Sequence, residues 1–331
     1  MGFEQVFYEP DALEYELGKT LREQYRSLPW TPVQSHNNID ALRARPNTDF
    51  ARLKRYLIIG VRKSLAYTVN HKVSDYLVPY TSSGCSAMCL YCYLVCNYNK
   101  CSYLRLFVNR EQMLARLMRE AARAEGDKVY EIGSNSDLVL ENTITHNLAW
   151  TIEQFARGER GFITFPTKFD MVEPLLGLDH RGRVIARMSV NPQSIIQRVE
   201  FGTSPLHRRI SALNALCEAG YRTGILIAPV VLTEGWRADY TGLLEELCDR
   251  LSEKSKRGLM VEVIFMTYSY VHRAINREAF PHAVELYQPE LMTGRGRGKY
   301  CYREAARHEA EEFLRAQIAR FLPGAAIIYV V

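Results

Sequence analysis

Short apolar runs alternate with amphipathic segments between about residue 76 and residue 266. The runs have the length and composition of buried strands and cover residues 76–79, 104–108, 129–132, 162–164, 184–190, 223–228 and 259–265. Four segments between them carry apolar residues at three- and four-residue spacing, which is typical of helices: 110–125, 143–157, 204–219 and 240–253. Repeated strand-then-helix order indicates parallel strands with crossover helices. We therefore predict an α/β fold with a partial (β/α)6-type barrel.

The two ends of the chain follow other patterns. Residues 1–75 are polar and Arg-rich, and several prolines interrupt any long helix, so we expect a wrapping N-terminal extension. After residue 266 the sequence turns to Tyr, Arg and Gly, followed by a predicted helix at 303–321 and a strand at 326–330. The prediction is a chain of three parts: the extension 1–75, the barrel 76–266, and a small α+β unit 267–331.

Composition excludes several classes of protein. Of the 331 residues, 47% are hydrophobic and 24% are charged, which excludes disorder, a collagen-like repeat and a disulfide miniprotein. The longest strongly apolar stretch, 224–232, is too short to span a bilayer, and the first residues lack a signal-peptide pattern. We therefore expect a cytoplasmic protein with no membrane segment.

The basic residues are mainly Arg: 32 of the 42 cations, against 10 Lys, with a net charge of +5. Arg binds phosphate in a planar, bidentate manner, which would suit a nucleic-acid substrate. A GC-rich genome produces the same bias without functional meaning.

Five of the eight cysteines lie between residues 85 and 101. Cys85, Cys89 and Cys92 form a CxxxCxxC motif directly after the first predicted barrel strand. Three thiolates can hold a [4Fe–4S] cluster and leave one iron open, whereas a closed zinc site needs four ligands. A zinc loop completed by Cys96 or Cys101 is the alternative.

A CxxxCxxC motif with an aromatic residue before its third cysteine is the signature of radical SAM enzymes. Further segments resemble the spore photoproduct lyase family in the same order: YEPDALEY at 8–15, RMSVN at 187–191, IAP at 227–229, EGW at 234–236, GKY at 298–300 and IARFLPG at 318–324. The resemblance runs from about residue 7 to the end of the chain. It agrees with a cluster at the carboxyl end of a barrel strand, where barrel active sites form.

The resemblance implies a DNA repair enzyme. In this family, a [4Fe–4S] cluster reduces S-adenosyl-L-methionine to methionine and a 5′-deoxyadenosyl radical. The radical takes a hydrogen from C6 of 5-thyminyl-5,6-dihydrothymine, and two thymines are restored. The implied partners are DNA carrying this thymine dimer lesion and an electron donor such as ferredoxin or flavodoxin.

Site residues follow from the resemblance position by position. Cys85, Cys89 and Cys92 would ligate iron. The matching cofactor positions are Tyr91 near the adenine, Ser136 and Lys168 at the methionyl carboxylate, and Ser189, Asn191 and Ala228 along the amino-acid and ribose parts. Taken singly, a Ser can cap a helix, an Asn can form a turn and an Ala can fill a core.

The chain departs from the family at the hydrogen donor. Where the family has its donating cysteine, this sequence has Ser134, and an O–H bond is too strong to quench a thymine radical. We predict a relocated donor, Cys96 first and Cys101 second, with Tyr93 relaying the radical toward the cofactor. The alternative is that both cysteines are incidental buried thiols.

The lesion pocket departs as well. A family His-Arg pair is replaced by the FMTY segment at 265–268, and a family Arg-Tyr pair by Gly294 and Arg295. Cations and an aromatic ring still alternate in the hairpin that follows, so we predict DNA contacts from Arg295, Arg297, Lys299 and Tyr300. A solvated basic turn is the alternative reading.

Three functions remain open from the sequence. The first is a lyase that reverses spore photoproduct with a relocated hydrogen donor. The second is a radical SAM paralogue that acts on a different nucleic-acid lesion or a modified base. The third is a cluster-bearing DNA-binding sensor without turnover.

Overall fold

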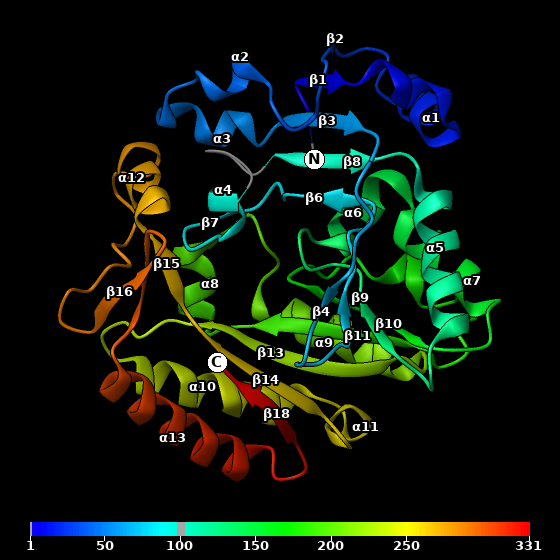
Figure 1. Ribbon diagram of the computed structural model, residues 1–331. Helices are drawn as coiled ribbons and strands as arrows, with labels where there is room; N and C mark the ends of the chain where they lie inside the picture. The colour runs from blue at the N-terminus through cyan, green and yellow to red at the C-terminus, as the bar shows by residue number, and fades with distance from the viewer. Residues whose placement is uncertain (1, 98–102) are drawn as a thin grey trace. The chain divides into compact units, whose positions relative to one another are not determined.

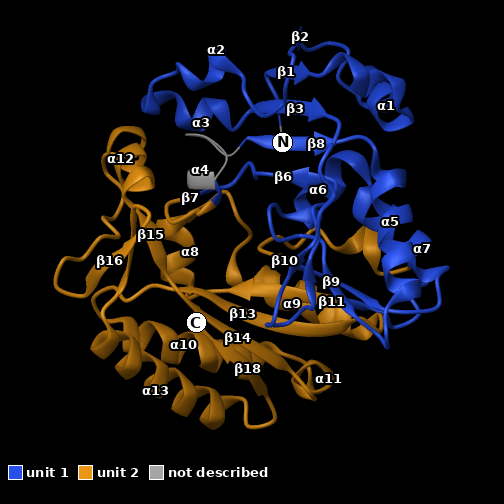
Figure 2. Ribbon diagram, viewed as in Figure 1, with its two compact units in different colours: residues 1–88, 94–165, 178–184 blue, residues 89–93, 166–177, 185–331 orange. Residues whose placement is uncertain are grey.

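The computed structural model describes residues 2–97 and 103–331, with the side chains of residues 96 and 97 left out of the description. The chain forms two compact units (Figure 2). Unit 1 contains Met1–Met88, Leu94–Phe165 and Leu178–Val184, and unit 2 contains Cys89–Tyr93, Pro166–Gly177 and Ile185–Val331. The division into 1–75, 76–266 and 267–331 stays a prediction.

Unit 1 contains a five-stranded sheet in the order β2-β1-β3-β8-β6 (Figure 1). Its strands are β2 (Trp30–Pro32), β1 (Gln5–Tyr8), β3 (Tyr56–Gly60), β8 (Leu104–Phe107) and β6 (Ser82–Ser83). The first four are parallel along the sheet, and β6 runs antiparallel to β8. The sequence pattern did not predict β1, β2 or β3, so residues 1–75 contribute strands that it missed.

One face of this sheet forms an apolar core with helix α1 (Glu16–Gln24). The core includes Val6, Leu57, Ile59, Leu104 and Leu106 from the strands and Leu17 and Leu21 from the helix. Since successive residues of a strand point to opposite faces, Ile58, Arg105 and Phe107 belong to the other face.

Unit 1 also contains β9 (Val129–Glu131), which is parallel to β5 (Tyr76–Leu77) and to β10 (Phe162–Thr167). Strand β4 (Thr68–Val69) runs antiparallel to β5. Its further helices are η1 (Pro10–Glu14), α2 (Asp40–Arg43), η2 (Asn47–Asp49), α3 (Phe50–Leu53), α4 (Leu94–Asn97), α5 (Arg110–Arg123), α6 (Leu138–Thr145) and α7 (Asn147–Ala156).

The predicted helix at 143–157 is wrong as a single helix. Residues 143–145 belong to α6, and α7 begins at Asn147, because His146 between them has a left-handed φ of 55°. The Asn142 side chain accepts a hydrogen bond from the Ala149 N–H and satisfies one of the free donors at the start of α7. No Gly or Pro marks this break in the sequence, so the apolar periodicity runs through it.

Unit 2 contains a parallel sheet in the order β18-β14-β13-β11. Its strands are β11 (Val184–Val190), β13 (Arg222–Val230), β14 (Met260–Phe265) and β18 (Ala326–Val330). Helix α9 (Leu206–Glu218) packs on β13, and α10 (Trp236–Arg250) packs against α9 and α13 (Glu304–Phe321). Shorter elements are η3 (Glu173–Leu175), α8 (Gln193–Val199), β12 (Glu200–Phe201) and α11 (Glu253–Lys256); β7 (Met88–Cys89) lies at the unit boundary in the sequence.

A second sheet of unit 2 is antiparallel and has the order β15-β17-β16. It consists of β15 (Thr267–Ser269), β16 (Met292–Gly296) and β17 (Lys299–Tyr302), and α12 (Tyr270–Ala279) follows β15. Each of the seven predicted runs contains a strand, and the predicted 303–321 helix and 326–330 strand are present; β11 and β18 have the predicted ends, and the other elements are shifted at one end or both. In the part of the chain that the structure describes, no helix is long and apolar enough to cross a membrane.

Candidate active site

The cysteine motif begins in unit 1 and continues in unit 2. In unit 1, Cys85 follows Gly84, whose φ of 80° favours glycine. The Cys85 carbonyl oxygen accepts a hydrogen bond of 2.8 Å from Nζ of the buried Lys54. In unit 2, the Cys92 N–H donates to the Cys89 carbonyl oxygen at 3.1 Å. The motif backbone is thus fixed by local hydrogen bonds in both units.

No disulfide joins the cysteines whose side chains the structure describes. Three thiolates at this spacing are a suitable donor set for an iron–sulfur cluster. Among the described residues, however, no three Cys, His, Asp or Glu side chains are gathered closely enough to hold a metal ion. The assignment of Cys85, Cys89 and Cys92 as iron ligands therefore stays a prediction.

Ser136 lies beside the start of the motif in unit 1. It forms a parallel bridge with Gly84, and its hydroxyl oxygen is 2.7 Å from the Ser82 hydroxyl oxygen. Ser82 also donates to Oε2 of Glu141, which is fully buried. Burial raises the pKa of Glu141, and hydrogen bonds from surrounding hydroxyl and amide groups limit the rise. A predicted cofactor residue is thus connected to the residue that precedes Cys85.

Glu200 is the centre of a buried polar network in unit 2. Its Oε1 accepts hydrogen bonds from Tyr91 Oη at 2.5 Å, Asn191 Nδ2 at 2.9 Å and Lys168 Nζ at 3.2 Å. Its Oε2 accepts one from Nη2 of Arg209 at 2.6 Å, and the side chains of both residues are fully buried. One carboxylate therefore connects three of the predicted cofactor residues.

The charges in this network fix its protonation. Burial alone would raise the pKa of Glu200, but the Lys168 and Arg209 charges and the hydrogen bonds from Tyr91 and Asn191 outweigh it and lower the pKa to about 2. Burial and the Glu200 charge raise the pKa of Tyr91 well above its usual value. Near neutral pH, Glu200 is therefore a carboxylate and Tyr91 a neutral phenol that donates to it.

Lys168 contacts the strands β11 and β13 as well as Glu200. Its ammonium group donates to the Ser189 hydroxyl at 2.5 Å and to the Ala228 carbonyl oxygen at 2.7 Å. The Ser189 hydroxyl also donates to the Ala228 carbonyl oxygen at 3.0 Å. Because β11 and β13 are parallel neighbours, these residues meet near the carboxyl ends of both strands.

Asn191 completes the arrangement directly after β11. Its Nδ2 donates to Glu200 and to the Pro229 carbonyl oxygen at 3.1 Å, and its Oδ1 accepts from the Tyr240 hydroxyl at 3.2 Å. Unit 2 therefore brings together five residues predicted to bind the cofactor: Tyr91, Lys168, Ser189, Asn191 and Ala228. The sixth, Ser136, belongs to unit 1.

The predicted basic hairpin is present as β16 and β17. Its turn consists of Gly296, Arg297 and Gly298, all with positive φ. Arg295 and Arg297 are exposed, whereas Lys299 and Tyr300 are half-buried. The Tyr300 ring centroid lies 4.3 Å from that of Tyr287. The hairpin therefore presents two exposed cations beside a supported aromatic ring.

Comparison with known proteins identifies the family. The family model described as "Spore photoproduct lyase" matches residues 2–331. The chain belongs to the spore photoproduct lyase family. It is 32% identical to the spore photoproduct lyase of Bacillus subtilis over 334 residues, which cover 98% of this chain and 97% of that protein. It is 31% identical to the enzyme from a Geobacillus species, with the same coverage.

Solved structures of spore photoproduct lyase agree with this chain over its full length. One, complexed with dinucleoside spore photoproduct, has a TM-score of 0.91 and 29% identity, and covers 99% of each chain. Another, a variant with bound AdoMet and dinucleoside spore photoproduct, gives the same values. The predicted α/β fold of the radical SAM partial-barrel type is thereby confirmed.

The predicted change of hydrogen donor concerns Ser134, Cys96, Cys101 and Tyr93. Ser134 is half-buried in the turn between β9 and α6 of unit 1. Of the predicted replacements, Cys96 lies in α4, but its side chain is not described, and Cys101 lies outside the described residues. Tyr93 is 49% exposed. The relocated donor stays a prediction.

The segment 265–268 is linked to the cysteine motif inside unit 2 through Asn276. Met266 and Tyr268 are each 1% exposed, so both side chains lie in the core. Nδ2 of Asn276 donates to the Tyr268 hydroxyl at 2.9 Å and to the Leu90 carbonyl oxygen at 2.7 Å. Leu90 lies between Cys89 and Cys92, so the changed segment supports the motif backbone through Asn276.

Sequence reasoning missed Glu200, Arg209 and Asn276. Glu200 follows α8 in the two-residue strand β12, and no motif marks it. Arg209 falls on the apolar face of α9, among buried residues. A cation at such a position could have been noticed in the sequence, because it needs a buried partner. Asn276 lies on α12, which the sequence did not predict.

Proposed function

We propose that this protein is a radical SAM lyase that repairs DNA by reverting spore photoproduct to two thymines. The observation that carries the proposal is the full-length agreement with a relative solved with dinucleoside spore photoproduct, at a TM-score of 0.91. The hydrogen-bond network of unit 2 supports it: Glu200 binds three predicted cofactor residues, and Lys168 connects two more, Ser189 and Ala228. A sensor without turnover has little use for such a set of residues.

The implied cofactors are a [4Fe–4S] cluster and S-adenosyl-L-methionine. Cys85, Cys89 and Cys92 would hold the cluster. When bound, the two cofactors supply the adenosyl radical that abstracts hydrogen from the lesion. A relative in this family has been solved with AdoMet bound, which supports the second cofactor.

The residues of unit 2 would bind and orient S-adenosyl-L-methionine. The Lys168 ammonium donates to Ser189, Glu200 and the Ala228 carbonyl, so a methionyl carboxylate has to replace one of these acceptors. Glu200 holds the Lys168 ammonium and the Tyr91 phenol in fixed positions and prevents either from rotating away. Ser136 of unit 1 would supply a hydroxyl to the same carboxylate.

The hydrogen donor would be Cys96, with Cys101 second and Tyr93 as the relay. The argument rests on Ser134, because serine cannot give up its hydroxyl hydrogen to a thymine radical. The protein would act in the cytoplasm on DNA bearing the lesion, with a ferredoxin or flavodoxin as electron donor. Arg295, Arg297, Lys299 and Tyr300 would contact the DNA.

A second candidate is a radical SAM lyase for a different lesion or modified base. It is favoured by one observation: the segment 265–268, where the family has a His-Arg pair, presents Met266 and Tyr268 to the core. Polar contacts that the family makes there would be missing.

Anaerobic turnover tests the proposal. The reconstituted protein is given S-adenosyl-L-methionine, dithionite and dinucleotide spore photoproduct, and thymine dinucleotide and 5′-deoxyadenosine are measured by mass spectrometry. We expect both products from the native protein and from Cys248→Ala on α10, and neither from Cys85→Ala. Cofactor cleavage without repair, on dinucleotide and on lesion-bearing duplex, would transfer support to the second candidate.

A further inference from the structure

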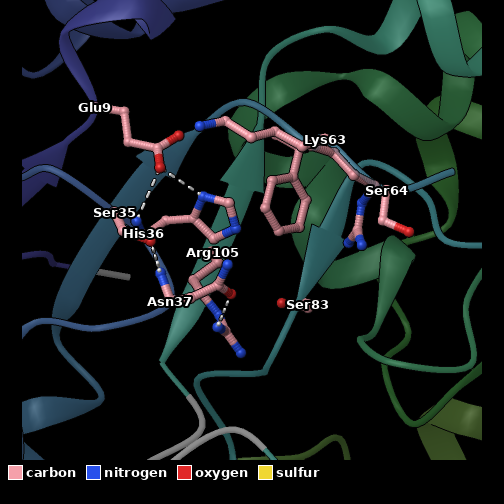
Figure 3. A pocket seen from close by; sticks show the side chains of 10 residues that line it. Glu9, Ser35, His36, Asn37, Lys63, Ser64, Ser83 and Arg105 are labelled. Atoms are coloured by element: carbon pink, nitrogen blue, oxygen red, sulfur yellow. Dashed lines mark hydrogen bonds and ion pairs between the residues drawn. The ribbon is translucent and has the colours of Figure 1, made fainter.

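Unit 1 contains a cavity of about 250 Å³ on the face of its sheet opposite the α1 core. Figure 3 shows its ten lining side chains. They are Glu9, Ser35, His36, Asn37, Arg62, Lys63, Ser64, Ser83, Arg105 and Phe107. Residues 9, 35–37 and 62–64 lie within five residues after the ends of the parallel strands β1, β2 and β3. Ligands of α/β sheets typically bind at such carboxyl ends.

The cavity carries excess positive charge. Among its lining residues, Arg62, Lys63 and Arg105 are cationic and Glu9 is the one acid. The Glu9 carboxylate is already engaged: Oε1 accepts from the His36 N–H and from Nδ1 of His36, both at 3.0 Å, and Oε2 accepts from the Val61 N–H at 2.8 Å. With three cations and one carboxylate, the charged lining residues carry a net charge of +2.

The cations are held in place by neutral groups. Arg62 stacks 3.8 Å from the centroid of the Phe107 ring and donates from Nε to the Tyr80 carbonyl oxygen at 2.8 Å. Arg105 is 2% exposed and has Nη1 3.5 Å from Oδ1 of Asn37. Lys63 is exposed and has no ion-pair partner among the described residues. A rigid pair of guanidinium groups is therefore accompanied by one adaptable ammonium group.

Hydroxyl donors accompany these charges. Ser83 is 3% exposed and lines the cavity, so its hydroxyl can donate to a bound ligand. Ser83 is paired in register with Arg105 across β6 and β8, so both groups belong to the same edge of the cavity.

The backbone is shaped to keep the cavity wall in place. A Cβ atom at Gly60 would lie 2.7 Å from Nδ1 of His36 and 2.8 Å from Oε2 of Glu9. Glycine at the end of β3 therefore permits the Glu9–His36 pair to close against the sheet. The His36 ring packs edge-on at 5.0 Å from the Phe107 ring.

We propose that this cavity binds the terminal phosphate of a small molecule. Guanidinium, ammonium and hydroxyl donors around a concave site match the oxygens of a phosphate monoester. A DNA phosphodiester fits less well, because its two ester links leave in opposite directions, whereas Ser83 and Arg105 are almost fully buried. The proposal is independent of the lyase activity.

Isothermal titration of the anaerobically purified full-length protein with inorganic phosphate tests the site. We expect saturable binding that weakens about tenfold in Ser83→Ala, which loses a hydrogen bond to a charged ligand. We expect about a threefold loss in Lys63→Ala, whose ammonium group is exposed. Lys19→Ala, an exposed lysine of α1 outside the cavity, should bind phosphate as the native protein does.

A second arm distinguishes the source of the phosphate. Thymidine 5′-monophosphate should compete with inorganic phosphate, and a single-stranded oligonucleotide without terminal phosphates should not. The proposal would be overturned if phosphate binding were not saturable. It would also be overturned if Ser83→Ala and Lys63→Ala both bound phosphate as tightly as the native protein. So would oligonucleotide binding that depends on Lys63, since it would assign the cavity to the DNA backbone.

Discussion

The Tyr91 hydroxyl donates a hydrogen bond to the Glu200 carboxylate with 2.5 Å between the two oxygen atoms. Tyr91 lies between the second and third cysteines of the motif, and Glu200 follows α8 more than a hundred residues later. The same Glu200 oxygen accepts from Lys168 and Asn191. Glu200 therefore couples the backbone of the cysteine motif to the residues at the carboxyl ends of the sheet strands.

Replacing Glu200 should destabilise the fold as well as the cofactor site. In Glu200→Gln, Arg209 keeps its charge in a fully buried position but loses its ionic partner. Removal of one partner from a buried pair costs about 3 kcal/mol of unfolding free energy. Denaturant unfolding measures the loss.

A matched control is Glu253→Gln on α11, where Glu253 is exposed and pairs with Lys256; loss of this pair should leave unfolding almost unchanged. Glu200→Gln should also bind S-adenosyl-L-methionine more weakly, because Lys168 and Tyr91 lose their common acceptor. Native-like stability and cofactor affinity in Glu200→Gln would refute this role for the network.

Stability should depend on Glu200 at acid pH. The native pKa of about 2 lies below the usual 4.5, so the unfolded chain binds the proton first as pH falls. The stabilising contribution is complete above about pH 4.5 and is lost as pH falls toward 2. The difference in unfolding free energy between the native protein and Glu200→Gln should therefore be constant from pH 7 to 5.

Below pH 4.5 that difference should shrink by roughly 1.4 kcal/mol per pH unit. Urea unfolding of both proteins at a series of pH values, at constant ionic strength, gives the curve. A difference that grows on acidification would contradict the low pKa of Glu200.

The hairpin turn should tolerate a methyl group at one glycine but not at another. In Gly298→Ala the new Cβ would overlap the Tyr270 ring, and φ is 73° at this position. Gly294, in β16 of the same hairpin, has open space around it and serves as the matched control. We expect Gly298→Ala to lower the unfolding free energy by about 1–3 kcal/mol, whereas Gly294→Ala should change it little.

The double variant Gly298→Ala/Tyr270→Ala separates the two causes. It removes the ring overlap but keeps the left-handed backbone, so it should recover part of the lost stability. Full recovery would show that backbone strain contributes nothing, and no recovery would show that the ring does not matter. Thermal unfolding of the four proteins is sufficient.

The parallel strands after residue 75 could be predicted because each is a short apolar run bounded by polar residues. β11 and β13 are examples, and the ends of the helices differ by only a few residues. The strands β1 and β3 were missed because the Arg-rich, Pro-containing segment around them hides two short apolar runs. The break at His146 was missed because a left-handed His, with no Gly or Pro beside it, ends α6.

The candidate site could be predicted where a motif marks it, as for Cys85 or Lys168. Glu200 and Arg209 form a pair across the fold, and neither has a local signature, so only a structure brings them together. Ser83 and Arg105 became neighbours for the same reason, through the register of β6 against β8.

Removing the exposed cations of the hairpin should weaken DNA binding uniformly across sequences. Arg295→Ala and Arg297→Ala each remove one charge available to a phosphate, so the slope of log affinity against log salt should fall by about 1 in each variant. Arg320→Ala on the exposed surface of α13 is the control with the same change in net charge. Fluorescence anisotropy with labelled duplex measures the affinity of all three variants. An equal change in slope for Arg320→Ala would show that the effect comes from net charge and not from the hairpin.

Cys96→Ala tests the relocated hydrogen donor. Adenosyl radical formation depends on the cluster and cofactor, so 5′-deoxyadenosine release should stay near the native level. Thymine yield should fall at least tenfold, with the substrate radical diverted to adducts, because Ser134 cannot supply the hydrogen. Cys217→Ala, a buried thiol on α9, is the control that should leave both products unchanged. Unchanged thymine yield in Cys96→Ala would exclude Cys96 and make Cys101 the predicted donor. Cys101→Ala then gives the same test. For either cysteine, deuterium from D₂O in the product would report an exchangeable thiol donor.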